Sequence, residues 1–138
     1  MKIFIKINKI DHVHIYVDAL DLAELWYSNI LGFSRDESLY FWFEQGGPLI
    51  LKNNGASIAL FKRDSHHSGH TVAFGVSAEE MTTLITNLNK NNITFMIGDH
   101  GVSMSVYFCD LNKNKIEVTS YEYLTAKNKI ELANAILF

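Results

Sequence analysis

The octapeptide IDHVHIYV at residues 10–17 decides the fold, because polar and apolar side chains alternate along it. Val13, Ile15 and Val17 fall on one face of a strand with this period of two, and two histidines and a tyrosine fall on the other. Apolar residues at helical spacing follow, and Gly32 stands where a C-terminal helix cap is expected. The segment therefore predicts a β-strand followed by a helix of about three turns.

The rest of the chain predicts short strands and one more strand-helix pair. In the first half, β-rich runs separated by turn-forming residues predict strands at 39–43, 49–52 and 57–62. In the second half, the predicted elements are a strand at 70–76, a helix that begins at a capping box of Ser77 and Glu80, and strands at 93–97, 104–109 and 115–121. The element order of the first half thus returns in the second.

Superposing the two halves with an offset of 58 residues places His12 on His70 and Ile58 on Ile116. An internal repeat of this size indicates two units, each with an apolar face that its twin, or the copy in a second chain, covers. We therefore predict an α+β fold with two βαβββ modules related by a pseudo-two-fold repeat, forming a curved mixed sheet around a central cavity. All 138 residues form a single domain in this prediction, with module 1 at about 10–64, module 2 at about 70–123 and a helical tail at 124–138.

Composition excludes several classes of partner. The formal net charge of -3 gives no basic field for nucleic acid or an anionic membrane surface. The single cysteine, Cys109, allows no internal disulfide and no cysteine-based zinc site. The N-terminal residues alternate lysine and asparagine with apolar side chains, unlike a signal peptide, and no run is long enough to span a membrane. We expect a cytoplasmic protein that acts on a small molecule.

The candidate site residues are distant in sequence. In a pseudo-two-fold arrangement the equivalent first strands would bring His12 and His70 together, and Glu117 on the core-facing side of its strand would need a partner or a cation. Two imidazoles and a carboxylate form the set used by open sites for non-haem iron and other divalent metals. Ala59 occupies the repeat position equivalent to Glu117, which leaves coordination positions for water, oxygen or substrate.

Structural roles also explain the same three residues when each residue is taken singly. Glu117 fits the solvent face of an antiparallel sheet, where its neighbours in sequence are also polar. His12 and His70 fit hydrogen-bonded structural histidines. The joint occurrence of the three under one repeat is the argument for a metal site.

With these residues in place, the stretch 10–123 resembles the vicinal oxygen chelate superfamily, which includes glyoxalase I, bleomycin-resistance proteins, fosfomycin-resistance transferases and extradiol dioxygenases. The opening strand, the helix ending in Leu31-Gly32-Phe33 and the segment 70–76 are similar to the first strands and first helix of its modules. The resemblance implies that His12, His70 and Glu117 are the metal ligands. Ala59 departs from glyoxalase I, which has a second glutamate there.

Residues 98–110, which lead to Glu117, are similar to the extradiol dioxygenase signature. The resemblance implies that His100 handles protons on substrate and oxygen, and that Tyr107 donates a hydrogen bond to oxygen at the metal. His14 would shuttle protons or orient the ligand. Two departures concern the turn before Glu117, where Leu111 and Lys113 replace the usual proline and glycine.

The resulting expectation is a homodimeric enzyme with a divalent metal, Fe²⁺ before Mn²⁺, Zn²⁺ or Ni²⁺, that cleaves the ring of a catechol-like substrate with two adjacent oxygens. Ala126 replaces the phosphonate-binding arginine of fosfomycin transferases, which argues against a phosphonate substrate. Two alternatives stay open. One is metal-free sequestration of an aromatic antibiotic, as in bleomycin resistance, with residues 40–43 as the stacking surface. The other is glyoxalase-like or thiol-transferase chemistry.

Overall fold

The computed structural model describes residues 9–63 and 71–137, which form two βαβββ modules and a C-terminal helix. The elements of module 1 are β1 (Val13–Val17), α1 (Leu20–Leu31), β2 (Ser34–Arg35), a 3-10 turn (Glu37–Leu39), α2 (Tyr40–Glu44), β3 (Leu49–Asn53) and β4 (Ala56–Lys62). The elements of module 2 are β5 (Val72–Gly75), α3 (Ala78–Lys90), β6 (Met96–Asp99), β7 (Met104–Cys109) and β8 (Lys115–Ser120). Helix α4 (Tyr123–Leu137) follows.

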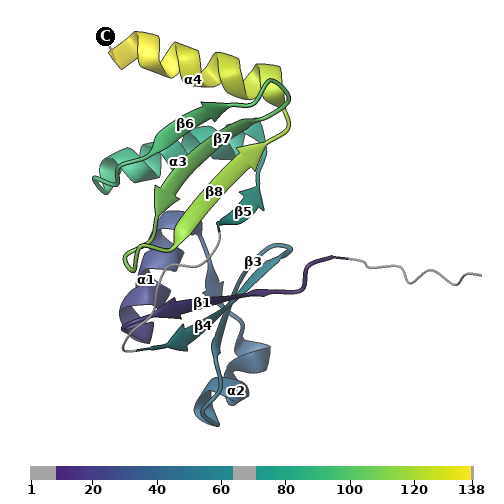
Figure 1. Cartoon of the computed structure of the whole chain (residues 1–138), viewed down its shortest axis with the longest axis vertical. Coiled ribbons are helices and arrows are strands. Elements are labelled where there is room, and N and C mark those ends of the chain that lie inside the picture. The colour runs from purple at the N-terminus through teal and green to yellow at the C-terminus, as the bar shows by residue number, and fades with distance from the viewer. Residues whose placement is uncertain (1–8, 64–70, 138) are drawn as a thin grey trace, which may run out of the picture.

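Each module contains its own four-stranded mixed sheet. Sheet 1 has the order β1-β4-β3-β2 and sheet 2 the order β5-β8-β7-β6; in both, the first strand runs parallel to its neighbour and the other pairs are antiparallel. Figure 1 shows the two sheets one above the other along the long axis of the molecule. The predicted α+β class and the two-module repeat are confirmed, with two separate sheets in one chain.

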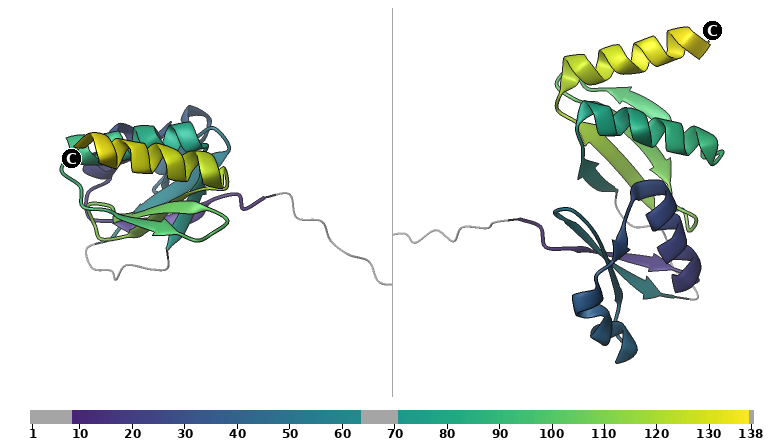
Figure 2. Two further views of the ribbon diagram at one scale, coloured as in Figure 1. Left: turned by 90° about the horizontal axis from the view of Figure 1, so that it is seen from above. Right: turned by 180° about the vertical axis from the view of Figure 1, so that it is seen from behind.

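Helices cover one face of each sheet. Helix α1 packs on sheet 1, whereas α3 and α4 pack on sheet 2, and α1 meets α3 between the modules (Figure 2). The inward side chains of both sheets and of these helices form one continuous apolar core. We call the opposite face of each sheet, turned away from these helices, its open face.

The local signals of the sequence place the helices correctly. Gly32 ends α1 in the left-handed conformation, with φ of 71°, and the Ser77 side chain accepts a hydrogen bond from the Glu80 N–H at the start of α3. On β1, Ile15 and Val17 are buried and His14 is exposed, as the alternation predicts. The predicted tail helix begins at Tyr123, at the edge of the expected range.

The strand predicted at 39–43 is wrong, because these residues form the end of the 3-10 turn and then α2. Asp36 caps this turn by accepting a hydrogen bond from the Ser38 N–H, and Gly46, with φ of 91°, follows the helix. The short strand β2 takes the place beside β3 that the prediction gave to the aromatic run. The high β propensity of aromatic residues is overridden here by caps and by pairing elsewhere.

The strand predicted at 93–97 is present as β6, but it is shifted along the chain. The strand begins at Met96 instead of residue 93, because the Ile93 N–H bonds back to the Leu88 carbonyl at the end of α3. Ile93 and Phe95 pack against the core on the way to the strand. The last two strands lie within one residue of their predicted bounds.

Strand register corrects the repeat offset. His14 lies opposite Ala59, and Ala73 lies opposite Glu117. The last strands of the modules are therefore 58 residues apart (117 minus 59), whereas the first strands are 59 apart (73 minus 14). An offset of 58 in the first strands would match the buried Val17 with the exposed Gly75. Residues on the buried face of β1 would then be matched with residues on the exposed face of β5.

One additional residue between strand and helix in module 1 explains this difference, since Val17 precedes the N-cap of α1 by two residues and Val76 precedes that of α3 by one. By register, the residue equivalent to His12 is Thr71, two positions before Ala73. The predicted equivalence of His12 with His70 is therefore off by one residue, and His70 itself lies outside the described residues.

The turn between β7 and β8 joins the modules. The buried Tyr27 hydroxyl of α1 donates a 2.8 Å hydrogen bond to Asp110, and the Asn114 side-chain amide donates to the Tyr16 carbonyl. Asp110 also accepts hydrogen bonds from the backbone N–H groups of Asn112 and Asn114. Burial, with Asp110 beside it, raises the pKa of Tyr27, so its hydroxyl remains a donor. The junction is thus a polar cluster inside an otherwise apolar contact.

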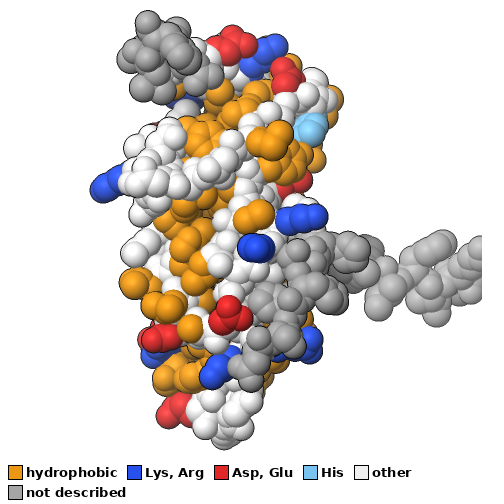
Figure 3. Space-filling model, turned by 60° about the vertical axis from the view of Figure 1, so that its left-hand side comes forward, with side chains coloured by type: hydrophobic (Ala, Val, Ile, Leu, Met, Phe, Trp, Pro, Cys, Tyr) orange, Lys and Arg blue, Asp and Glu red, His pale blue; other side chains and the backbone are white. Residues whose placement is uncertain are grey.

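Exposed apolar side chains occur in both modules and on α4. Figure 3 shows hydrophobic side chains as a broken band along the length of one face, between charged groups. The most exposed large ones in the described chain are Ile10, Tyr121, Met96, Leu124, Val102 and Leu132. No helix among the described residues is both long enough and apolar enough to cross a membrane.

Candidate functional site

A row of rings lines the open face of sheet 1. His14 contacts Phe61 of β4, with ring centroids 4.7 Å apart, and Phe61 in turn contacts Tyr16. The Arg63 guanidinium lies 3.8 Å from the centroid of the Tyr16 ring. These residues share a face because alternate positions of β1 and the paired positions of β4 point the same way.

His12 and His14 form a pair at the start of this row. Their rings stack with centroids 5.0 Å apart, and their Nε2 atoms are 3.0 Å apart. The other ring nitrogen of His12, Nδ1, lies 2.8 Å from the Asp11 carboxylate. The hydrogen bond from His12 lowers the pKa of Asp11, which keeps this carboxylate ionised beside the ring.

The open face of sheet 2 has a different chemistry. Glu117 is half-buried on β8 and accepts a 2.8 Å hydrogen bond from Ser105, whose side chain is fully buried on β7. Tyr107 lies directly opposite Glu117 in the antiparallel pair β7–β8. A carboxylate and two hydroxyl groups thus share one small area of this face.

His100 joins this group from the turn between β6 and β7. Its Nε2 atom lies 2.7 Å from the Tyr107 hydroxyl, and the two rings meet edge to face. Gly98 allows this approach, since a Cβ there would lie 2.9 Å from the Tyr107 ring and 3.2 Å from His100. The structure therefore brings two of the predicted catalytic residues into contact.

Helix α4 anchors the turn that carries His100. The Asp99 carboxylate accepts hydrogen bonds from the Gly101 N–H and from the Tyr123 hydroxyl, and Lys127 lies 3.4 Å away. These donors, the Gly101 N–H first, lower the pKa of Asp99, and the contacts with Tyr123 and Asp99 raise the pKa of Lys127. The helical tail thus fixes the position of a candidate site residue.

An apolar groove of about 530 Å³ borders Tyr107 at one end of sheet 2. Most of its lining residues are aliphatic or aromatic; Thr71, Thr94, Tyr107 and Lys115 are the lining residues with a hydroxyl group or an amine. Its lining residues are Thr71, Ile93, Thr94, Phe95, Met96, Tyr107, Phe108, Cys109, Lys115 and Ile116. The groove can hold the apolar body of a small ligand whose polar end meets Tyr107.

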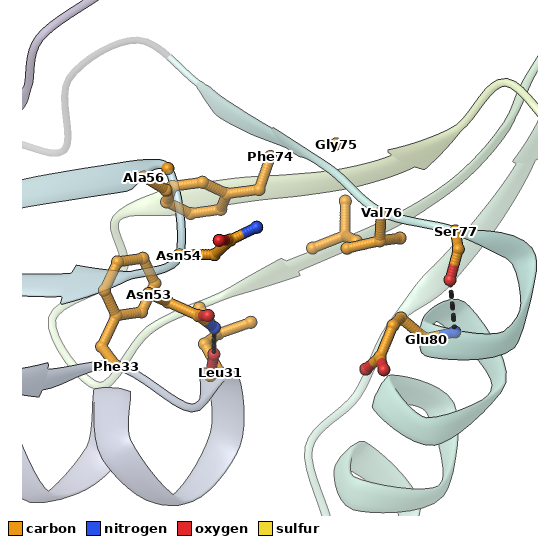
Figure 4. Close-up of a pocket in the computed structure, with 12 residues that line it drawn as sticks. Leu31, Phe33, Asn53, Asn54, Ala56, Phe74, Gly75, Val76, Ser77 and Glu80 are labelled. Atoms are coloured by element: carbon orange, nitrogen blue, oxygen red, sulfur yellow. Dashed lines mark hydrogen bonds between the residues drawn. The ribbon is translucent and has the colours of Figure 1, made fainter.

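A second groove, of about 610 Å³, lies between the modules (Figure 4). The end of α1 and the β3–β4 turn line one side, and β5 with the start of α3 lines the other. Figure 4 shows Leu31 and Asn53 on one side of this space and Ser77 and Glu80 on the other. Among the described residues that line it, Glu80 is the one ionisable side chain, and none of the predicted site residues is present.

The predicted site residues therefore fall into two groups. His12 and His14 lie together on sheet 1, whereas His100, Tyr107 and Glu117 lie together on sheet 2. Across residues 9–63 and 71–137, no three histidine, cysteine, aspartate or glutamate side chains of one chain gather as a metal site would require. The metal set of His12, His70 and Glu117 stays a prediction, because His70 is outside these residues.

The βαβββ repeat, the position of Glu117 and the His100–Tyr107 pair all point to one protein family, and the family comparison agrees. The model of the Glyoxalase/Bleomycin resistance protein/Dioxygenase superfamily matches residues 9–118. The chain belongs to this superfamily. No curated protein sequence matches the chain significantly.

Solved structures of this superfamily share the fold. A glyoxalase family protein from Bacillus anthracis is 19% identical, with a TM-score of 0.69 over 86% of this chain and 99% of that one. An oxidase, ChaP-H2, is 16% identical, with a TM-score of 0.69 over 86% and 98% of the two chains. The fosfomycin resistance protein FosX of Listeria monocytogenes, solved with Mn(II) and a dihydroxypropylphosphonic acid, is 17% identical, with a TM-score of 0.69 over 83% and 93%.

Sequence reasoning missed three contributors to these two groups. Ser105 supports Glu117, Asp11 orients His12, and Asp99 holds the His100 turn to α4. Alternation along β7 was the available signal for Ser105, because it shares a face with Tyr107. The structure also explains Ala126, which is a fully buried residue of α4 in the apolar core and so does not face either group.

Proposed function

We propose that this superfamily member is a divalent-metal-dependent enzyme that acts on a small substrate with two adjacent oxygen atoms, with ring cleavage of a catechol-like compound as its reaction. The observation that carries the proposal is the cluster on the open face of sheet 2. There, a carboxylate supported by Ser105 lies opposite a tyrosine whose hydroxyl meets His100 at 2.7 Å. A histidine and a tyrosine in contact can hold and move protons on a hydroxylated substrate.

The donor set of the described chain fits a divalent cation in part. Glu117 offers the carboxylate oxygen that Ser105 does not engage, and His12 is oriented by Asp11 in the way that metal-binding histidines are oriented by a carboxylate. The position equivalent to His12 in module 2 holds Thr71, which is a weak donor. A bound divalent ion would polarise two adjacent substrate oxygens, and iron(II) would in addition supply redox chemistry with dioxygen.

We propose that the working site forms between two copies of the chain. β1 and β5 are the end strands of their sheets, and no described strand pairs with the second edge of either. Unpaired edges of this kind are templates for pairing with another chain. Pairing β1 of one copy with β5 of another would bring the open faces of sheets 1 and 2 side by side, and His12 toward Glu117. Two such contacts related by a two-fold axis give a closed homodimer.

In this site each residue group has a distinct task. The apolar groove beside Tyr107 would bind the substrate ring and exclude water, while the Tyr107 hydroxyl would orient a substrate oxygen by a hydrogen bond. His100, in contact with that hydroxyl, would accept and return the proton of a substrate hydroxyl. The edge strand β5 carries only small side chains on this face, Ala73 and Gly75, and so leaves space in front of Glu117.

The test is oxygen uptake by anaerobically iron(II)-loaded protein with a panel of catechols, followed by product spectra. We expect uptake by the unaltered chain, loss of uptake in Glu117→Ala, and retention in Glu80→Ala. Glu80 is the matched control because it lines the other groove and engages α3 through its backbone N–H. Thiol-dependent turnover without oxygen uptake would contradict ring cleavage, and metal-free protein that binds an aromatic drug would contradict the enzyme.

A further inference from the structure

We infer that Lys115 makes the groove beside Tyr107 selective for a substrate that carries a carboxylate at the end of its apolar body, away from the reacting oxygens. This inference rests on the proposed function and narrows its substrate to catechol-like rings with an acidic side chain. The observation behind it is the distribution of charge along the groove.

The lining of the groove holds one cationic residue and no acidic one among the described residues. Lys115 is the cation, and the other lining residues are apolar or carry a neutral hydroxyl or thiol group. Within the described chain, Lys115 forms no ion pair. The groove is therefore locally positive in a chain whose net charge is -3. One ammonium group complements one carboxylate, whereas a doubly charged group would keep part of its charge unpaired beside apolar walls.

Strand register places Lys115 in line with the candidate catalytic residues. Lys115 lies opposite Cys109, and Glu117 lies opposite Tyr107, in the same antiparallel pair. Lys115 is exposed and Ile116 is buried, so Lys115 and Glu117 share the open face of sheet 2. The two rows are about 7 Å apart along the strands, a separation that a six-membered ring with substituents at opposite ends can bridge.

The walls near these rows suit an aromatic ring. Phe95, Met96 and Phe108 all line the groove, and Met96 lies opposite Tyr107 across β6 and β7. The Met96 side chain is 72% exposed, and a bound ring would cover part of it. The aliphatic stem of Lys115 can pack along the same ring while its amine meets the acid.

A ligand held at both ends has a single orientation in the groove. An ion pair at Lys115 would fix which ring oxygen meets the Tyr107 hydroxyl, and so which oxygen lies near His100. An uncharged side chain would remove water from the amine without replacing its hydrogen bonds. The groove should therefore discriminate between an acid and its neutral amide.

The test compares para-hydroxyphenylacetate with its amide, which has nearly the same shape but no charge. Calorimetry measures binding to full-length protein without added metal, so that the carboxylate cannot bind to a cation, and NMR of the Met96 methyl group reports on occupancy of the groove. We expect the acid to bind about 10-fold more tightly, as one charge-assisted hydrogen bond provides. Lys115→Met should abolish this preference and Lys115→Arg should retain it. Lys113→Met is the matched control, because it removes the same charge from a residue outside the groove.

Equal affinity for the two probes in the unaltered chain, absence of binding by both, or a preference that persists in Lys115→Met would overturn the inference. These measurements need neither metal nor turnover, so their outcome is separate from that of the proposed function. Oxygen uptake at equal kcat/KM with dihydroxyphenylacetate and with its amide would overturn the inference and leave ring cleavage in place. A preference that depends on Lys115, in protein that consumes no oxygen with any catechol, would support the acid-selective groove and contradict ring cleavage.

Discussion

The two modules share one topology and strand order but carry opposite chemistry on their open faces. Module 1 presents imidazole and aromatic rings, with the fully buried Ala59 in the middle strand pair. Module 2 presents hydroxyl groups and a carboxylate, with Glu117 at the equivalent position. A duplicated scaffold can thus divide a site into a nitrogen half and an oxygen half without any change of fold.

The connection between the second and third strands differs as well. In module 1 it contains the 3-10 turn and α2, which packs on β3. In module 2 it is a tight turn that carries His100 to Tyr107. Loops tolerate such change because few core contacts depend on them. The same connection therefore packs on the sheet in module 1 and carries a candidate site residue in module 2.

The largest expected effect comes from giving module 1 the carboxylate of module 2. Ala59→Glu is expected to lower the free energy of unfolding by about 3–5 kcal/mol, because Ala59 is fully buried and an unpaired carboxylate there loses its hydration. The reverse change, Glu117→Ala, is expected to cost about 1 kcal/mol, since it removes one hydrogen bond from a half-buried group. Urea unfolding measures both. Equal stability of the two variants would contradict the contrast between the faces.

The next effect concerns the junction of the modules. Asp110→Ala is expected to cost about 3 kcal/mol, because it leaves the buried Tyr27 hydroxyl and the N–H groups of the turn without their acceptor. Tyr27→Phe is the milder control, at about 1–2 kcal/mol, because Asp110 keeps its other donors. Thermal unfolding by calorimetry compares them. A larger loss in Tyr27→Phe than in Asp110→Ala would contradict the Asp110 carboxylate as the group that holds the junction.

A smaller effect on the free energy of unfolding is expected at the turn that precedes the last strand of each module, and it differs between the two turns. Lys113 in module 2 and Asn54 in module 1 both adopt left-handed backbone, with φ of 65° and 51°. Asparagine tolerates this conformation and lysine does so at a cost of about 1 kcal/mol, so Lys113→Gly is expected to stabilise by about 0.5–1 kcal/mol and Asn54→Gly by less. The chemical denaturation midpoints of the two glycine variants show which substitution stabilises more. A greater gain at Asn54 would be the contrary result.

The smallest effect is a pH dependence at the α4 anchor, which module 1 lacks. The pKa of Asp99 lies below its ordinary value of 3.8, so its contacts contribute stability above that value and lose it as the pH falls through the lowered pKa. Asp99→Asn is therefore expected to melt slightly below the unaltered protein at neutral pH, with the difference vanishing once the pH lies below the lowered pKa of Asp99. A difference that grows as the pH falls would refute the direction of the shift.

Local chemistry explains how much of the fold the sequence predicts. The alternation around Ile15, the left-handed cap at Gly32 and the Ser77 cap act within a few residues and are visible in the sequence. The aromatic run at 40–43 is misleading because its conformation depends on which strand pairs with β3. The repeat offset misleads by one residue because the insertion before α1 alters no recognisable motif.

The candidate site was predictable in parts. The pair of His100 and Tyr107 follows from the family signature, because both lie on one hairpin whose register the turn determines. The link between His12 and Glu117 depends on how sheets of two copies meet, which no pattern within one chain specifies. The alternation of β1 places His12 and His14 on the same face, so their contact could have been predicted. Superposing the two halves of the sequence drew attention to His70 instead.

The central claim is that one site needs sheet 1 of one copy and sheet 2 of another. Co-expression of His12→Ala and Glu117→Ala chains with different tags, followed by tandem purification, yields a mixed dimer. The account predicts that neither variant alone binds Mn(II), whereas the mixed dimer binds about half the wild-type amount, because one of its two symmetric sites keeps both an intact His12 and an intact Glu117. A mixed dimer without bound Mn(II), or a wild-type chain that binds Mn(II) as a monomer, would contradict it.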